Sequence, residues 1–177
     1  MLNTLIGDVG HLGVIVAFVA AIVAAYSYYK ASQGRALGDT DAAWLRLGRG
    51  AFALHGVAVF VVIAALFGII HGHRYEYYYA WSHSSNHLPV YYMISCFWEG
   101  QEGSFLLWMF WQAVLGLILI RTQKTWEAPV MSVFALVQAF LASMIMGVVI
   151  PGIDLKLGSS PFILLRDAIP DEIGRAH

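Results

Sequence analysis

Residues 83–111 read HSSNHLPVYYMISCFWEGQEGSFLLWMFW, and this stretch lies between two long apolar runs. Its acidic segment GQEGS (100–104) leads directly into the apolar segment FLLWMFW (105–111). A carboxylate next to hydrocarbon is costly, so such a residue usually has a functional reason to be there. We therefore predict that this stretch forms a functional loop at a membrane face and that the rest of the chain supports it.

The composition indicates an integral membrane protein. Of 177 residues, 59% are hydrophobic and only 12% are charged, whereas a soluble domain is roughly half apolar and about a quarter charged. The net charge of −1 argues against nucleic-acid binding and against a polybasic membrane anchor. The single cysteine, Cys96, cannot form an internal disulfide, and we interpret it as a packing residue.

Four apolar runs are each long enough to cross about 30 Å of hydrocarbon as a helix. The predicted spans cover residues 9–29, 51–70, 104–120 and 128–150. Between spans two and three, the apolar spacing after Pro89 predicts a short helix that lies in the membrane interface. The aromatic residues of 75–81 predict an interfacial belt. The predicted fold class is thus all-α: a polytopic bundle of four membrane helices with an interfacial helix on its outer face.

The basic residues predict the orientation of the bundle. Four of them follow span one (Lys30, Arg35, Arg46 and Arg49), and two more, Arg121 and Lys124, follow span three. Loops rich in lysine and arginine remain in the cytoplasm. The amino terminus and the loop 71–103 are therefore predicted to face outward, into the periplasm of a Gram-negative organism.

Several short strings follow one another in a characteristic order. They are His83-Ser84-Ser85, Leu88-Pro89, Tyr91-Tyr92, Trp98-x-Gly100-Gln101-Glu102-Gly103-Ser104, Leu107-Trp108 and Gly158-Ser159-Ser160-Pro161-Phe162. In this order they resemble the CcmF-type cytochrome c biogenesis proteins, the membrane haem lyase subunit of the haem handling family. The resemblance covers roughly residues 75–170. It implies that an outer platform is formed by His83, Ser84, Ser85, Trp98, Gly100, Gln101, Glu102, Gly103, Ser104 and Trp108.

The resemblance also implies a function. Members of the family are multi-pass proteins of the bacterial inner membrane that handle haem and attach it to the thiols of apocytochrome c. They cooperate with a haem chaperone and other maturation subunits. Their Trp-rich periplasmic motif is not present in this sequence, and their usual haem histidines lie beyond residue 177. We expect residues 1–172 to be an amino-terminal part that is inactive alone, surrounded by lipid and without nucleic-acid partners.

The last five residues suggest where this part ends. Residues 173–177 read IGRAH, which is what the opening bases of a widely used sequencing-library adapter encode. We therefore expect the genuine protein sequence in this chain to end near Asp171, with residues 173–177 read from the adapter.

The histidines leave a second function open. His11 and His71 are predicted at the outer ends of spans one and two, where two histidines could ligate haem b. Interfacial hydrogen bonding is the simpler interpretation. A bis-histidine haem b or quinol-oxidising membrane subunit is thus one alternative function, and a non-catalytic assembly scaffold is another. His71 and His73 lack a third ligand at a metal-binding spacing, so no metal site is predicted.

The carboxylates Glu99 and Glu102 also allow two interpretations. Three residues apart on a helix, they would lie on one side and could share a proton. Alternatively, Glu102 stabilises the start of span three while Gly100 and Gly103 permit a tight turn or a close backbone approach. We prefer the second interpretation. Trp98, Trp108 and Trp111 could likewise offer a flat face to a porphyrin. Anchoring of the chain in the interface is the simpler interpretation of these tryptophans.

Overall fold

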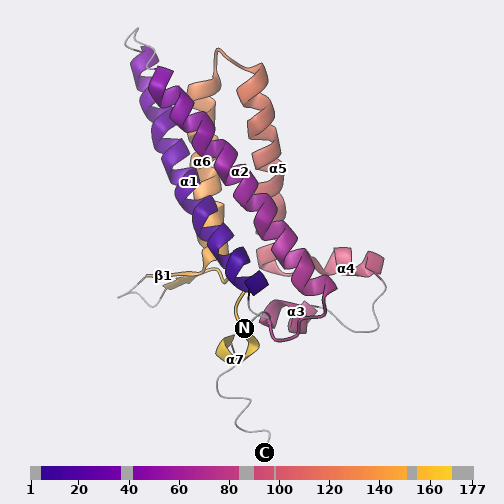
Figure 1. The fold of residues 1–177 in the computed structure, drawn as a ribbon. Coiled ribbons are helices and arrows are strands. Elements are labelled where there is room, and N and C mark those ends of the chain that lie inside the picture. The colour runs from indigo at the N-terminus through magenta and orange to yellow at the C-terminus, as the bar shows by residue number, and fades with distance from the viewer. Residues whose placement is uncertain (1–4, 37–41, 84–89, 98, 151–154, 169–177) are drawn as a thin grey trace, which may run out of the picture.

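The computed structural model describes residues 5–36, 42–83, 90–97, 99–150 and 155–168. Four long helices form a bundle: α1 (Leu5–Ala36), α2 (Ala42–His71), α5 (Gln101–Thr122) and α6 (Glu127–Met146) (Figure 1). Each of them is long and apolar enough to cross a membrane. The predicted fold class, an all-helical polytopic bundle, is confirmed.

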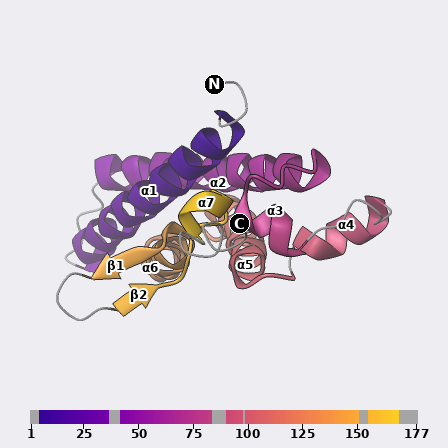
Figure 2. The same ribbon diagram turned by 90° about the horizontal axis from the view of Figure 1, so that it is seen from below.

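Close packing of α1 holds the bundle together. It lies along α2 and also contacts α6, which in turn contacts α5, and Figure 2 shows this arrangement from below. Small residues such as Ala17, Ala21 and Ala24 are fully buried on α1. Small side chains let helix backbones approach closely where burial from water does not drive association. Many large apolar side chains point outward instead, as on Leu12 and Phe140, which suits a surface facing lipid.

The short elements gather at one end of the bundle (Figure 1). These are α3 (Tyr78–His83), α4 (Val90–Phe97), the strands β1 (Val148–Ile150) and β2 (Leu155–Leu157), and α7 (Leu165–Ala168). The start of α1 lies at the same end. The described parts of the loop 71–103 and of the segment after α6 therefore share one end of the bundle with the start of α1, as the alternation of spans predicts. The helix predicted after Pro89 is present as α4; its position in a membrane interface stays a prediction.

The predicted extent of span four is wrong. Helix α6 ends at Met146, and Gly147 follows in the left-handed conformation with φ of 71°. Val148–Ile150 then forms strand β1, which pairs antiparallel with Leu155–Leu157. Glycine adopts positive φ without steric cost and commonly ends helices in this way. The apolar run continues past Gly147, so hydropathy alone extended the predicted helix to Ile150.

Candidate functional site

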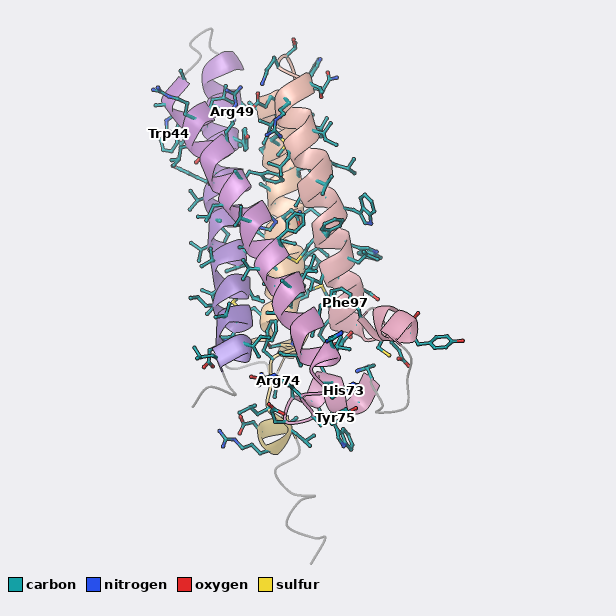
Figure 3. The ribbon with its side chains drawn as sticks, turned by 45° about the vertical axis from the view of Figure 1, so that its right-hand side comes forward. Trp44, Arg49, His73, Arg74, Tyr75 and Phe97 are labelled. Atoms are coloured by element: carbon teal, nitrogen blue, oxygen red, sulfur yellow. The ribbon has the colours of Figure 1, made fainter. Side chains whose placement is uncertain are left out.

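A buried tyrosine lies at the centre of the end formed by α3, α4 and the start of α5. Tyr79 is 2% exposed, and its hydroxyl donates a 2.7 Å hydrogen bond to the carbonyl of Phe97. Burial raises the pKa of Tyr79 above its ordinary value, so the phenol remains a neutral donor. Figure 3 shows Phe97 where α4 approaches α5.

Gly100 and Gly103 make room for this tyrosine. A Cβ at Gly100 would lie 2.6 Å from Cε2 of Tyr79. A Cβ at Gly103 would lie 2.6 Å from the Tyr79 hydroxyl and 1.7 Å from the Phe97 carbonyl oxygen. Both glycines are therefore needed for close approach, which is one of the roles predicted for them.

The two segments that carry the family resemblance meet at Glu102. Glu102 lies in the first turn of α5, and its Oε1 accepts a hydrogen bond from the Ser159 hydroxyl. Gly158 has φ of 68°, and a Cβ there would lie 1.8 Å from the carbonyl oxygen of Met144. The chain after α6 is thus held against both α6 and the start of α5.

The same segment forms a seam with the loop before α3. Tyr78 donates its N–H to the Ile163 carbonyl at 3.0 Å, and Leu165 donates its N–H to the Glu76 carbonyl at 2.8 Å. Phe162 is 7% exposed, and its ring packs against Gly10. A Cβ on Gly10 would lie only 2.3 Å from that ring. The seam therefore ties the loop after α2 and the segment after α6 to the start of α1.

From here on, the term outer platform denotes the described residues of this assembly, 71–83, 90–97, 99–104 and 158–168. The word outer follows the predicted orientation, which stays a prediction. Tyr77 fastens α1 to the outer platform, since Gly7 donates its N–H to the Tyr77 hydroxyl at 3.2 Å. Tyr77 is 1% exposed, whereas Tyr78 is 41% and Trp81 is 51% exposed. The predicted aromatic belt is therefore wrong for Tyr77 and Tyr79, which fill the interior of the platform.

The structure brings several of the predicted platform residues together around Tyr79. His83 stacks on its ring with 4.6 Å between the ring centroids, and its Nδ1 lies 2.7 Å from the Ser82 hydroxyl. Ser104 donates its N–H to the Gly100 carbonyl at 3.2 Å. Gln101 is exposed. Ser84, Ser85 and Trp98 lie outside the described residues.

Trp108 stands apart from the platform residues. It is 58% exposed on the side of α5 and makes an edge contact with Phe105, with 6.0 Å between the ring centroids. This position favours the anchoring interpretation, since an exposed indole on a membrane helix suits the lipid interface.

The remaining predicted groups of the platform are two carboxylates and a thiol. Glu99 is exposed and Glu102 is half-buried, and no described hydrogen bond joins them. Cys96 is 4% exposed, and burial, with a further contribution from Glu99, raises the pKa of its thiol. A neutral, buried thiol agrees with a packing role.

His11 and His71 occupy different surroundings. His11 lines a cleft of about 830 Å³ between α1 and the segment after α6, together with Asp8 and Arg166. His71 is exposed at the end of α2, where its ring tilts against Phe67 with 5.9 Å between the centroids. No described contact joins the two histidines, and their pairing on one haem stays a prediction.

The polar residues inside the bundle connect helices. His55 is fully buried, and its Nδ1 lies 2.8 Å from the carbonyl oxygen of Ala17. Gln138 donates to the carbonyl of Met109 at 2.8 Å. Each of these contacts links two helices.

Two structural features escaped the sequence analysis. One is the central position of Tyr79, for which the paired glycines of 100–103 were the available signal. The other is an ion pair between Arg49 of α2 and Glu127 of α6 at the end of the bundle opposite to the outer platform. From the sequence, Arg49 is predicted only to be one of the basic loop residues, because a single sequence does not indicate which carboxylate pairs with it.

Comparison of the sequence with protein-family models and with curated proteins gave no match. Among solved structures, the chain is similar to one titled "Cytochrome c Heme Lyase CcmF", with a TM-score of 0.69 and 22% sequence identity. The similarity covers 89% of this chain and 25% of that chain, so this chain spans a quarter of the length of that protein. The chain therefore has the fold of part of a CcmF haem lyase, as its motifs predict.

Proposed function

We propose that this chain is the amino-terminal part of a CcmF-type protein for cytochrome c maturation in the bacterial inner membrane. The observation that carries the proposal is the hydrogen bond between Glu102 and Ser159. It joins the two segments that resemble the family, and it does so on a fold shared with a cytochrome c haem lyase.

In this proposal the outer platform supports the site where haem is attached to apocytochrome c. Its packing suits this supporting role. Tyr79 of α3 is enclosed by Phe97 of α4 and by Gly100 and Gly103, and so it holds α3, α4 and the start of α5 together. Rigid elements position a functional site more accurately than loops alone. The haem ligands and the groups that form thioether bonds to Cys-x-x-Cys-His thiols would come from elsewhere in the full protein. A haem chaperone and further maturation subunits would be its partners.

The proposed orientation places the platform in the periplasm. Most of the basic residues lie at the other end of the bundle, where Figure 3 labels Arg49 and Trp44. They are Lys30 and Arg35 near the end of α1, Arg46 and Arg49 near the start of α2, Arg121 at the end of α5, and Lys124 just after it. By the positive-inside rule that end faces the cytoplasm.

The test is complementation of a strain that lacks the corresponding gene. The gene would carry Glu102→Ala, Ser159→Ala or Gly103→Val, and covalent haem in c-type cytochromes would be measured by haem staining. We expect Gly103→Val to abolish maturation and the two milder variants to lower it several-fold. Val133→Ala on α6, which replaces a 58% exposed side chain far from the platform, is the matched control.

Membrane levels of each variant, measured by immunoblotting, separate loss of function from loss of protein. Normal cytochrome maturation by Gly103→Val at normal membrane levels would contradict the proposal. The non-catalytic scaffold alternative would then be the better description of the chain.

A further inference from the structure

An apolar groove follows α1 and α2 on the surface of the bundle. Its volume is about 590 Å³. The residues of α1 in its wall are all aliphatic, from Ile15 to Val23, and those of α2 run from Arg46 to Leu54. Arg46 is the single charged residue among them. The groove is thus apolar along its length and cationic at one end.

Gly50 gives the groove part of its depth. A Cβ on Gly50 would meet no atom of the protein within 4 Å, so no neighbouring side chain or backbone of this chain requires glycine there. Glycine inside a helix is less stable than alanine by about 1 kcal/mol. Because Gly50 has no side chain and lines an apolar groove on a membrane helix, another molecule can approach the backbone of α2 closely there.

The length of the groove matches one leaflet of a bilayer. From Ile15 to Val23, α1 rises about 12 Å, while half of a hydrocarbon core is about 15 Å. The charged end lies close to aromatic residues typical of the headgroup region. There Tyr26 meets Trp44 edge to face at 5.7 Å, and Lys30 lies 5.7 Å above the Tyr26 ring.

We propose that this groove binds an anionic glycerophospholipid, with an acyl chain along α1 and α2 and the phosphate at Arg46. The guanidinium of arginine binds phosphate through charge-assisted hydrogen bonds. Arg46 is exposed, and no carboxylate of the described residues forms an ion pair with it. The proposal is independent of the function in cytochrome maturation.

The test measures lipid binding to the full chain by native mass spectrometry. The purified protein in detergent is titrated with phosphatidylglycerol or, separately, with phosphatidylcholine. We expect Arg46→Gln to weaken binding of phosphatidylglycerol about tenfold, as the loss of a charged hydrogen bond predicts, and to leave phosphatidylcholine unchanged. Arg121→Gln removes an exposed arginine of α5 at the same end of the bundle, and it should leave the binding of both lipids unchanged.

A second pair of variants tests the groove itself. Gly50→Leu fills the groove from α2 and Val23→Phe fills it from α1, and both should weaken binding of the two lipids several-fold. Ala53→Leu, on the exposed surface of α2 outside the groove, is the control of equal bulk. Circular dichroism spectra and thermal melting confirm that each variant is folded.

Two results would overturn the proposal. The first is equal binding of phosphatidylglycerol by the wild-type protein, Arg46→Gln and Gly50→Leu. The second is a dimer of the chain that Gly50→Leu and Val23→Phe disrupt, because a second copy would then be the occupant of the groove.

Discussion

Arg49 donates two hydrogen bonds to the carboxylate of Glu127, each 2.6 Å long, and so joins α2 to the first turn of α6. The Glu127 side chain is 1% exposed and that of Arg49 is 36% exposed. This is the planar, two-point geometry that arginine offers and lysine does not. The pair lies at the end of the bundle away from the outer platform, and it joins α2 to α6 there.

Removing one partner of this pair should destabilise the bundle. Arg49→Gln leaves a buried carboxylate without its cation, and we expect the free energy of unfolding to fall by about 3 kcal/mol, the low end for buried pairs because Arg49 is partly exposed. The double variant Arg49→Leu with Glu127→Leu should lose less stability than Arg49→Gln, because no buried charge is left without a partner. Unfolding titrations with dodecyl sulfate in mixed micelles measure these differences. A double variant that is less stable than Arg49→Gln would contradict this account.

The two glycines of the platform should differ in their response to alanine. At Gly103 the new Cβ meets the backbone oxygen of Phe97, whereas at Gly100 its nearest neighbours all belong to the Tyr79 side chain. Overpacking typically lowers stability by about 1–3 kcal/mol. We expect Gly103→Ala to destabilise the protein more than Gly100→Ala does. Truncation by Tyr79→Leu should relieve the strain of Gly100→Ala but not that of Gly103→Ala. Thermal melting of single and double variants checks this order, and equal relief at both positions would contradict it.

Gly50→Ala is the matched control for these substitutions. Its Cβ meets no atom within 4 Å, so only helix propensity changes, and the melting temperature should stay the same or rise by an amount that corresponds to about 1 kcal/mol or less.

The Cys96 thiol should react slowly near neutral pH. Burial, and then the charge of Glu99, raise the pKa of this thiol, so at a given pH less of it is the reactive thiolate. The rate of alkylation by iodoacetamide should keep rising above pH 9. Glu99→Gln should move the midpoint of the pH dependence of alkylation to lower pH. Asp167→Asn, which removes an exposed carboxylate of α7, should leave that midpoint unchanged. A midpoint at or below about 8.5, the value of a free thiol, would contradict this prediction.

The proposed orientation can be read from single cysteines in a Cys96→Ser background. Tyr78→Cys lies in the platform and Arg121→Cys lies at the other end, and both positions are exposed. In intact spheroplasts, a membrane-impermeant maleimide should label Tyr78→Cys and label Arg121→Cys only after lysis. The reverse pattern would place the platform in the cytoplasm and exclude a periplasmic function for it.

The sequence predicted the four membrane helices because long charge-free runs have few other stable structures. It failed where apolar character alone does not select the structure. Val148–Ile150 is as apolar as a span, yet Gly147 ends α6 and the residues pair as a strand. Tyr77 and Tyr79 look like interfacial residues, and only their contacts with Gly7 and Gly100 reveal that they are buried.

The candidate site was predictable in its residues but not in its connections. Glu102 was expected near the start of a helix, and it lies in the first turn of α5. Its contact with Ser159, like that of Arg49 with Glu127, joins residues far apart in the chain. Such pairings depend on how the helices pack, and one sequence holds no periodic signal for them.

The packing of Phe162 against Gly10 also has a consequence for biosynthesis. The first helix enters the membrane early, but its aromatic neighbour is translated only after all four spans. At roughly 5–20 residues per second, on the order of ten seconds pass between the synthesis of Gly10 and that of Phe162. During that interval Gly10 lacks the aromatic ring that packs against it in the folded chain.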